Sequence, residues 1–202
     1  MPTPLILGSS SRYRAAALRT LGLEFHQITP NVDESPRKGE TPNDLALRLA
    51  QEKARYLAQR HPGAEVIGSD QVGSCERRLL SKPGTQANAI QSLQQCSGKI
   101  ATFYTALALA RSAPNGEIEI TGGISVTELK FRALNAEQIE YYVQQDMPTD
   151  AAGAFKAEGL GISLFDYVRA EDPSALIGLP LIALTTCLKG FGIDPLASRV
   201  GL

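Results

Sequence analysis

The chain has 202 residues, of which 43% are hydrophobic and 20% charged, and its formal net charge is −1. Such a composition is typical of an ordinary globular protein, and the near-neutral charge gives no broad positive field for nucleic acid or an anionic membrane. The longest nearly apolar stretch, residues 101–110, is too short to cross a bilayer, and the start Met1-Pro2-Thr3-Pro4 lacks the pattern of a signal peptide. We therefore expect no nucleic-acid or membrane partner, and any phosphate chemistry must depend on locally placed cations.

Cysteine and histidine usage narrows the chemistry further. Cys75, Cys96 and Cys187 form no CxxC pair and are odd in number, which disfavours a disulfide framework and indicates a reducing, cytoplasmic location. His26 and His61 are the only histidines, so a Ser-His-Asp triad or a His-rich zinc site is disfavoured. If the chain is an enzyme, carboxylates, lysines, arginines and a bound metal must carry the reaction.

The first half of the chain is predicted to alternate strands and helices. Apolar runs indicate the strands, and helix-start signals such as Thr41-Pro42 indicate the helices. The expected elements are a strand at residues 5–7, a helix at 12–21, a strand at 25–29, a turn at 30–36, a helix from 41 to about 60, and a strand at 64–69. The last of these strands is expected to deliver Asp70 at its carboxyl end.

The second half is predicted to contain a long antiparallel hairpin. Its two strands flank Pro114-Asn115-Gly116. The expected elements are a helix at 85–96, strands at 101–111 and 117–134, a helix from the capping signal 135–138 to 145, a strand at 162–165 and a helix at 180–189. The sequence thus predicts an α/β fold with a mixed twisted sheet and flanking helices. We expect one domain over residues 1–202, with two lobes around a cleft as an alternative form.

The first candidate site is the turn between the first strand and the first helix. A strand that runs through small hydroxyl residues into a helix presents free backbone N–H groups and a positive helix end, which suit an anion. Ser9 and Ser11 can add hydroxyl donors, and Arg14 adds a forked cation that matches phosphate. The alternative is that Ser10 or Ser11 caps the helix and Arg14 is simply solvated.

The second candidate is Lys53, which falls inside the apolar face of its predicted helix beside Leu49, Ala50 and Leu57. An unpaired ammonium is costly to bury, so this lysine must reach solvent, find an internal carboxylate or meet a phosphate. The sequence alone leaves all three open.

Carboxylates at two places are candidates for metal binding. Asp70 follows a buried strand, at the sheet edge where ligands bind in open α/β folds, and Asp33 and Glu34 lie in a turn. Oxygen ligands of this kind suit Mg²⁺ or Mn²⁺. A plain turn aspartate and a solvated acidic pair are the alternatives. Lys82, beside the rigid Pro83, is a third candidate cation, although most isolated lysines are only exposed.

Taken in order, these segments resemble the Maf-like nucleotide pyrophosphatases. The resemblance runs from residue 5 to about residue 192, and although each motif alone is weak, the ordered set is specific. The matching pieces are Ser9-x-Ser11-x-x-Arg14, Val32-Asp33-Glu34, the segment 49–54, Gly68-Ser69-Asp70-Gln71-Val72, Lys82-Pro83, Ser97-Gly98, the segment 152–159 and Gly178-Leu179-Pro180-Leu181. Through Gln71 and Glu158 the chain is most similar to the subgroup that acts on 7-methyl-GTP.

The resemblance implies a fold, a reaction and a set of roles. The fold is a mixed sheet and helices around an elongated cleft, related to inosine triphosphate pyrophosphatase. The reaction cuts a nucleoside triphosphate into a monophosphate and pyrophosphate, with a divalent cation (Mg²⁺, Mn²⁺ or Co²⁺) bound at Asp70 and Glu34, and with a homodimer as the suggested assembly. The implied roles are proton acceptor for Asp70, phosphate and metal binding for Ser9, Ser11, Arg14, Glu34, Lys53 and Lys82, and base choice for Tyr13, Gln71 and Glu158.

The base-selecting residues carry specific expectations. Tyr13 offers an aromatic face to a cationic methylated base, and Glu158 accepts hydrogen bonds from the guanine N1–H and amino group. Gln71 either binds the O6 edge or fixes Glu158.

The chain departs from the family pattern at three positions of the first helix. Arg12 stands where the family usually has proline, Tyr13 replaces the tryptophan of the subgroup, and Ala16 stands where many members carry glutamate. Two rival functions remain. One is a pyrophosphatase for UTP, dTTP or modified pyrimidines, and the other is a nucleotide-binding regulator of cell division without turnover.

Overall fold

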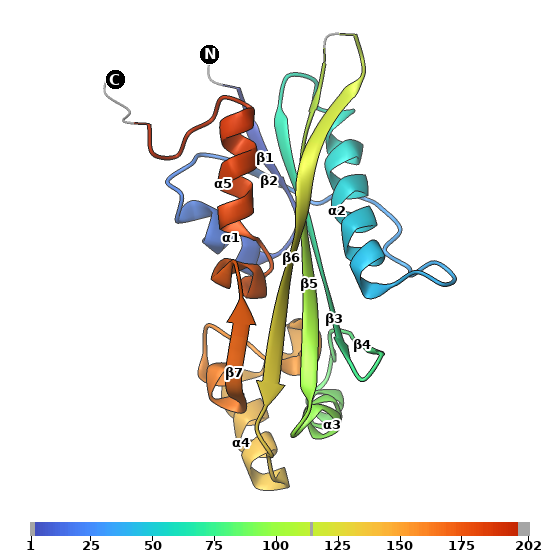
Figure 1. Ribbon diagram of the computed structural model, residues 1–202, viewed down its shortest axis with the longest axis vertical. Coiled ribbons are helices and arrows are strands. Elements are labelled where there is room, and N and C mark those ends of the chain that lie inside the picture. The colour runs from blue at the N-terminus through green and yellow to red at the C-terminus, as the bar shows by residue number, and fades with distance from the viewer. Residues whose placement is uncertain (1–2, 114, 198–202) are drawn as a thin grey trace.

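A seven-stranded mixed sheet runs the length of the molecule in the order β2-β1-β3-β5-β6-β7, with β4 paired to β3. The computed structural model describes residues 3–113 and 115–197 (Figure 1). The expected start Met1-Pro2 and the turn residue Pro114 lie outside the described residues. The strands are β1 (Leu5–Gly8), β2 (His26–Ile28), β3 (Glu65–Cys75), β4 (Arg78–Leu80), β5 (Ile100–Ser112), β6 (Ile118–Phe131) and β7 (Phe165–Ala170).

Polar side chains cap the N-termini of the first four α-helices. The helices are α1 (Arg12–Arg19), α2 (Pro42–Ala58), α3 (Gln86–Cys96), α4 (Ala136–Asp146) and α5 (Leu181–Gly190), with 3₁₀ helices η1 (Pro148–Asp150), η2 (Ala152–Ala154), η3 (Leu160–Leu164) and η4 (Pro173–Ile177). Ser11, Thr41, Thr85 and Asn135 each accept a hydrogen bond from a backbone N–H in the first turn of α1, α2, α3 and α4. The capping box predicted at Asn135 and Gln138 is confirmed.

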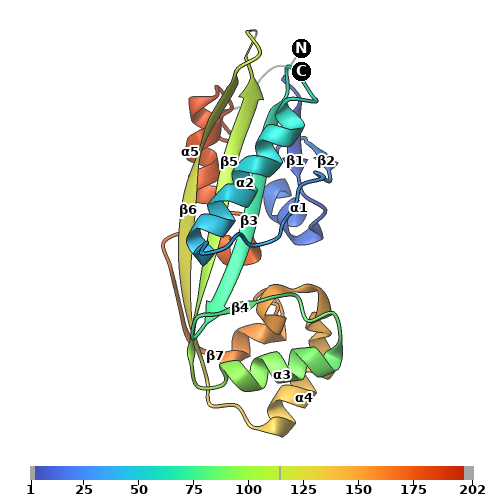
Figure 2. The ribbon, with the colours of Figure 1, turned by 90° about the vertical axis from the view of Figure 1, so that its right-hand side faces the viewer.

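Helices cover both faces of the sheet. α2 packs on one face, and α1 and α5 lie on the other, whereas α3, α4 and the short helices η1 and η2 gather at the opposite end of the molecule (Figures 1 and 2). Each of these regions has its own buried apolar cluster. The predicted mixed sheet with flanking helices is therefore confirmed. The assignment to one domain stays a prediction, although β3, β5 and β6 run through both halves.

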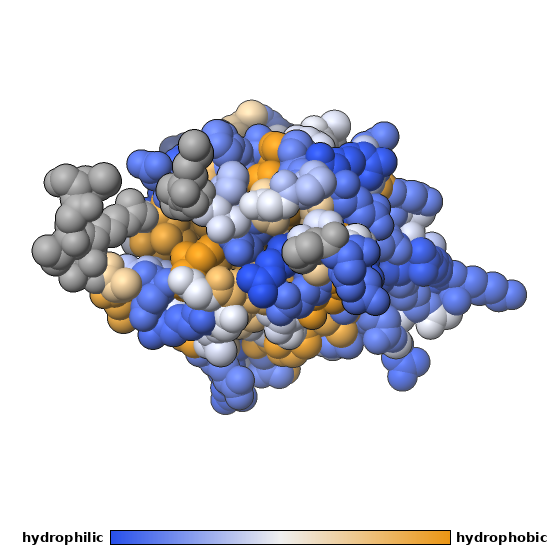
Figure 3. Space-filling view, turned by 90° about the horizontal axis from the view of Figure 1, so that it is seen from above, coloured by the Kyte–Doolittle hydropathy of each residue, from blue (hydrophilic) through white to orange (hydrophobic). Residues whose placement is uncertain are grey.

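The surface is largely polar, as the proportions of hydrophobic and charged residues lead one to expect. Seen from the end that carries the hairpin tip, it shows mostly hydrophilic side chains with smaller apolar patches between them (Figure 3). No helix of the described part of the chain has the length and apolar character that a membrane span requires.

Two predictions about secondary structure are wrong in detail, and one short strand was missed. The strand expected at 162–165 is the 3₁₀ helix η3, and the strand begins only at Phe165, because a short apolar run does not by itself distinguish the two. The short strand β4 was not predicted. Asp70 does not end its strand: β3 pairs in parallel with β1 only as far as Gly68 and then continues to Cys75 beside β5. Asp70 therefore lies in mid-strand, two residues beyond the end of the parallel pairing.

A close contact between α2 and β3 brings two candidate residues together. A Cβ atom on Gly68 would lie 2.2 Å from the carbonyl oxygen of Ala50 and 2.7 Å from the amide nitrogen of Ala54. Only glycine lets the helix backbone approach the strand this closely. Lys53, in the same turn of α2, consequently reaches Asp70, two residues further along β3.

Candidate active site

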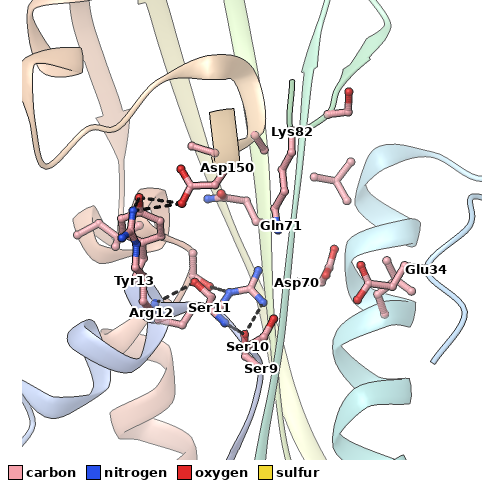
Figure 4. Close-up of a pocket in the computed structure, with 18 of the residues that line it drawn as sticks. Ser9, Ser10, Ser11, Arg12, Tyr13, Glu34, Asp70, Gln71, Lys82 and Asp150 are labelled. Atoms are coloured by element: carbon pink, nitrogen blue, oxygen red, sulfur yellow. Dashed lines mark hydrogen bonds and ion pairs between the residues drawn. The ribbon is translucent and has the colours of Figure 1, made fainter. Parts of the chain in front are cut away.

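A cleft of about 870 Å³ lies between the two halves of the molecule. One wall is formed by the turn after β1, the start of α1 and the buried face of α2, and the other by the β4–α3 loop and the segment 150–158. Figure 4 shows the side chains converging on the space between them. The sequence-predicted site residues Ser9, Ser11, Tyr13, Arg14, Glu34, Lys53, Asp70, Gln71, Lys82 and Glu158 line this cleft. Asp33, the other carboxylate of the acidic turn, does not; its Oδ1 accepts from the Ser35 amide instead.

The turn from β1 into α1 has the form of an anion site. Ser11 is the N-cap of α1, with its Oγ accepting from the Arg14 amide at 3.3 Å, and its own amide donates to Ser9 Oγ at 3.1 Å. The alternative given for this turn is therefore right in its first part, since Ser11 caps the helix, and wrong in its second, since Arg14 is not solvated.

Arg14 is held by neutral acceptors. Its Nε donates to the Gly178 carbonyl at 2.9 Å, and its Nη1 donates to the Ser69 carbonyl at 2.7 Å and to Ser9 Oγ at 3.4 Å. Burial lowers the pKa of this guanidinium, and the charges of Asp70 and Glu34 act in the opposite direction. An arginine stays protonated, and among the residues that the structure describes no carboxylate forms an ion pair with Arg14. Its charge and its Nη2 donors therefore remain for an anion in the cleft.

Lys53 bridges two carboxylates. Its Nζ lies 2.6 Å from Asp70 Oδ1 and 2.7 Å from Glu34 Oε1. The lysine is only 5% exposed, whereas the Glu34 side chain is 61% exposed at the rim. The structure thus decides among the three possibilities for Lys53 in favour of internal carboxylates. An ammonium has three donors, so one is left for a phosphate oxygen.

The same two carboxylates form a pair that suits a divalent cation. Among the described residues, no group of three or more His, Cys, Asp or Glu side chains is placed to hold a metal ion. Glu34 and Asp70 both lie within hydrogen-bond distance of one ammonium, so they can approach one cation from two sides. Mg²⁺ is commonly held by one or two carboxylates completed by substrate phosphates and water, and this pair fits that pattern.

Lys82 faces this cluster from the opposite wall. It is exposed, in the loop between β4 and α3, and within the described ranges no hydrogen bond or ion pair engages its ammonium. Its side chain points into the cleft toward Asp70 and Gln71 (Figure 4). Lys82 therefore offers an unpaired charge across from Arg14.

Three hydrogen-bond acceptors hold the Gln71 side chain in an orientation that the sequence did not predict. Its Nε2 lies 3.0 Å from each of three acceptors, Thr105 Oγ1 and the carbonyls of Ala175 and Leu176. These partners occupy the amide nitrogen, so it neither fixes Glu158 nor donates to the O6 edge of a base, and both expectations for this donor are wrong. The carbonyl oxygen is the group left to a ligand. Glu158 is exposed and also lines the cleft.

The structure adds Arg12, Asp150 and Lys156 to the cleft, and the sequence did not single them out as site residues. Arg12 Nη2 lies 2.8 Å from the Tyr13 hydroxyl and 3.2 Å from Asp150 Oδ2, and Lys156 Nζ lies 3.7 Å from Asp150 Oδ1. The segment 152–159 matched the family pattern, which placed Lys156 in a motif. Its partner Asp150 could not be paired with Arg12 from sequence, because 138 positions separate them.

Comparisons with known proteins find relatives over nearly the whole chain. The family described as Maf-like protein matches residues 4–191. A 7-methyl-GTP pyrophosphatase of Bordetella avium (strain 197N) is 48% identical over 194 residues, covering 96% of each chain. A 7-methyl-GTP pyrophosphatase of Xanthomonas oryzae pv. oryzae (strain MAFF 311018) is 49% identical over 188 residues, covering 93% of this chain and 96% of that protein. The solved nucleoside-triphosphatase / dITP/XTP pyrophosphatase of Mycobacterium abscessus matches with a TM-score of 0.40 and 17% identity, covering 94% and 95% of the two chains.

Proposed function

The chain belongs to the Maf-like protein family, and on that premise we propose that it is a nucleoside triphosphate pyrophosphatase. It cuts the bond between the α and β phosphates and releases a monophosphate and pyrophosphate. The observation that carries the proposal is the arrangement of Glu34, Lys53 and Asp70 beside the anion site at the start of α1. One cleft therefore joins groups that bind phosphate with groups that activate water.

Phosphate binding rests on the walls of the cleft. The backbone N–H groups at the start of α1 and the hydroxyls of Ser9 and Ser11 face one side of the triphosphate. Arg14 and Lys53 supply positive charge from that wall, and Lys82 supplies it from the other. Arg14 and Lys53 are held by hydrogen bonds and ion pairs before substrate arrives, so they stabilise charge that develops on the phosphates without reorganising.

Asp70 is the residue that orients and deprotonates the attacking water. Its Oδ1 is held by Lys53, which fixes the carboxylate and leaves Oδ2 for the water. The pyrophosphate leaving group gains charge as the bond breaks, and Lys53 and Lys82 are placed to stabilise it. The close contact of Lys53 with Asp70 also fixes where this carboxylate sits, as a general base requires.

The proposal includes a divalent cation, Mg²⁺, Mn²⁺ or Co²⁺, at Glu34 and Asp70. When bound, it neutralises phosphate charge and makes a nearby water more acidic. Glu34 is the better permanent ligand, because it lies on the rim of the cleft and Asp70 is needed as a base. The homodimer and the cytoplasmic location stay predictions.

For the base, we propose 7-methylguanine, so that the preferred substrate is 7-methyl-GTP. The relatives from Bordetella avium and Xanthomonas oryzae carry that substrate in their names. Gln71 Oε1 and the Glu158 carboxylate are both hydrogen-bond acceptors, and both residues line the cleft. Guanine presents two adjacent donors, its N1–H and its amino group, whereas uracil and thymine present only one. The wrong base leaves one of these acceptors without a donor. A site built in this way therefore discriminates strongly against such a base.

A screen of triphosphates with each of the three metals tests the proposal. We expect kcat/KM to be highest for 7-methyl-GTP, lower for GTP and lowest for UTP and dTTP, with no activity in excess chelator. Faster hydrolysis of UTP or dTTP would show that the pyrimidine alternative is right and the base assignment wrong. Tight binding of every nucleotide without turnover would favour the regulatory alternative.

A further inference from the structure

The Arg12 guanidinium lies between an aromatic ring and a carboxylate at one edge of the cleft. Its Cζ is 4.8 Å from the centroid of the Tyr13 ring, and its Nη2 is 3.2 Å from Asp150 Oδ2. Tyr13 and Asp150 also contact each other, since the tyrosine hydroxyl donates to the same Oδ2 at 3.3 Å. Figure 4 shows these three side chains together, facing Gln71 across the pocket.

Lys156 holds the Asp150 carboxylate in place. Lys156 Nζ lies 3.7 Å from Asp150 Oδ1, and the same ammonium donates to the carbonyls of Asp146 and Met147 at the end of α4. Burial acts to raise the pKa of Asp150, but Lys156 and Arg12 outweigh it, so that pKa stays below its usual value. Asp150 is therefore an ionised, positioned carboxylate beside an aromatic ring, and both line the cleft.

An aromatic face next to a carboxylate is a binding site for a flat cation. In this structure the flat cation is Arg12, whose side chain is 71% exposed. An exposed ion pair of this kind contributes little to stability, so another cation can displace it at low cost. A guanine methylated at N7 carries a positive charge spread over a planar ring, as a guanidinium does.

We propose that Tyr13 and Asp150 form a subsite for a positively charged base, and that Arg12 fills this subsite when no substrate is bound. The inference rests on the proposed function, because the ligand it names is the base of 7-methyl-GTP. It makes Arg12 and Asp150 specificity-determining residues. It also changes the role expected for Tyr13, because the face of the ring that a cationic base needs is first occupied by an internal competitor.

Opposite effects of two substitutions follow from the competition. Arg12→Ala removes the competing cation and leaves the ring and carboxylate free, which favours a cationic base over a neutral one. Asp150→Asn removes the negative charge that the cationic base needs. Both changes also alter the field that acts on the triphosphate, but that effect is shared by all nucleotides. The ratio of kcat/KM for 7-methyl-GTP to that for GTP cancels it.

The first experiment measures this ratio for the wild type and both variants. We expect Arg12→Ala to raise the ratio and Asp150→Asn to lower it, each by about three- to thirty-fold, the range that a cation–aromatic contact covers. Arg19→Ala is the matched control, because Arg19 is another α1 arginine over an aromatic ring, at 5.7 Å from the centroid of Phe25, and lies outside the cleft lining. The control should leave the ratio within twofold of wild type. An unchanged ratio in Arg12→Ala or Asp150→Asn, in protein with a wild-type Tm, overturns the proposal.

A second measurement separates this proposal from the proposed function. Binding of 7-methylguanosine and guanosine, which have no phosphates, is followed by NMR titration of the same proteins. The subsite predicts tighter binding of the methylated nucleoside, strengthened by Arg12→Ala and weakened by Asp150→Asn. If the wild type fails to hydrolyse 7-methyl-GTP but this binding pattern holds, the reaction is wrong and the subsite stands. If hydrolysis occurs but the three proteins bind both nucleosides equally, the subsite is wrong and the reaction stands.

Discussion

Replacing Gly68 by alanine tests whether the close approach of α2 to β3 is what brings Lys53 into contact with Asp70. The added Cβ would lie 2.2 Å from the Ala50 carbonyl oxygen, which is 1.2 Å short of the 3.4 Å at which ordinary contact begins. The obstacle is backbone on both sides, at Ala50 and Ala54, so no side chain can rotate away. The helix must therefore move off the sheet.

The size of the effect follows from that displacement. Overpacking of this kind costs about 3 kcal/mol at the upper end of its range, because two backbone groups are in the way. For a domain of this length, that lowers Tm by about 6–12 °C. A shift of about 1 Å also moves Lys53 Nζ out of its 2.6 Å contact with Asp70, and such a misplacement can cost about 10²-fold in rate.

Thermal unfolding and kcat are measured on Gly68→Ala and on Gly123→Ala. The second variant is a matched control, because Gly123 is also in a strand and a Cβ there has nothing within 4 Å. We expect Gly123→Ala to keep wild-type Tm and kcat. If Gly68→Ala unfolds and turns over like the control, the close packing of α2 does not position Lys53, and this explanation of the site is refuted.

The remaining predictions concern single side chains of the cleft. Asp70→Asn should lower kcat by at least about 10²–10⁴-fold while nucleotide binding, measured by calorimetry, survives; near-normal kcat would show that another group is the base. Lys82→Ala should raise KM and lower kcat together, whereas alanine at the exposed Lys38, outside the cleft lining, should change neither. Glu158→Gln should reduce the preference for GTP over UTP more than it reduces kcat with GTP, and an equal loss for both nucleotides would place Glu158 away from the base.

Much of the fold is predictable because local signals agree with the packing. The caps at Thr41, Thr85 and Asn135 mark the starts of three helices, and two long extended segments on either side of the turn at residues 114–116 predict the hairpin. The error at Leu160–Leu164 arises where local signals are weak: five residues that include a glycine and run directly into β7 fit a 3₁₀ turn and a strand equally well. There the tertiary contacts decide.

Some contacts of the candidate site are likewise predictable from local sequence, and others are not. Lys53 is recognisable because a lysine in an apolar helix face must either reach solvent or find an anion. The carboxylates that it contacts are the expected candidates Glu34 and Asp70. The contact of Arg12 with Asp150 is not predictable, because neither residue is unusual in its own segment. Only the fold brings the start of α1 beside η1.

The central claim, that this cleft cuts a nucleotide between its α and β phosphates, is tested most directly by identifying the products. Phosphorus NMR of 7-methyl-GTP incubated with the wild-type protein and Mg²⁺, Mn²⁺ or Co²⁺ distinguishes pyrophosphate from orthophosphate. We predict one pyrophosphate for each 7-methyl-GMP formed. Product formation should be slowed by at least about 10²–10⁴-fold in Asp70→Asn and should stop when chelator is in excess. Stepwise release of orthophosphate, with 7-methyl-GDP as an intermediate, would contradict the account.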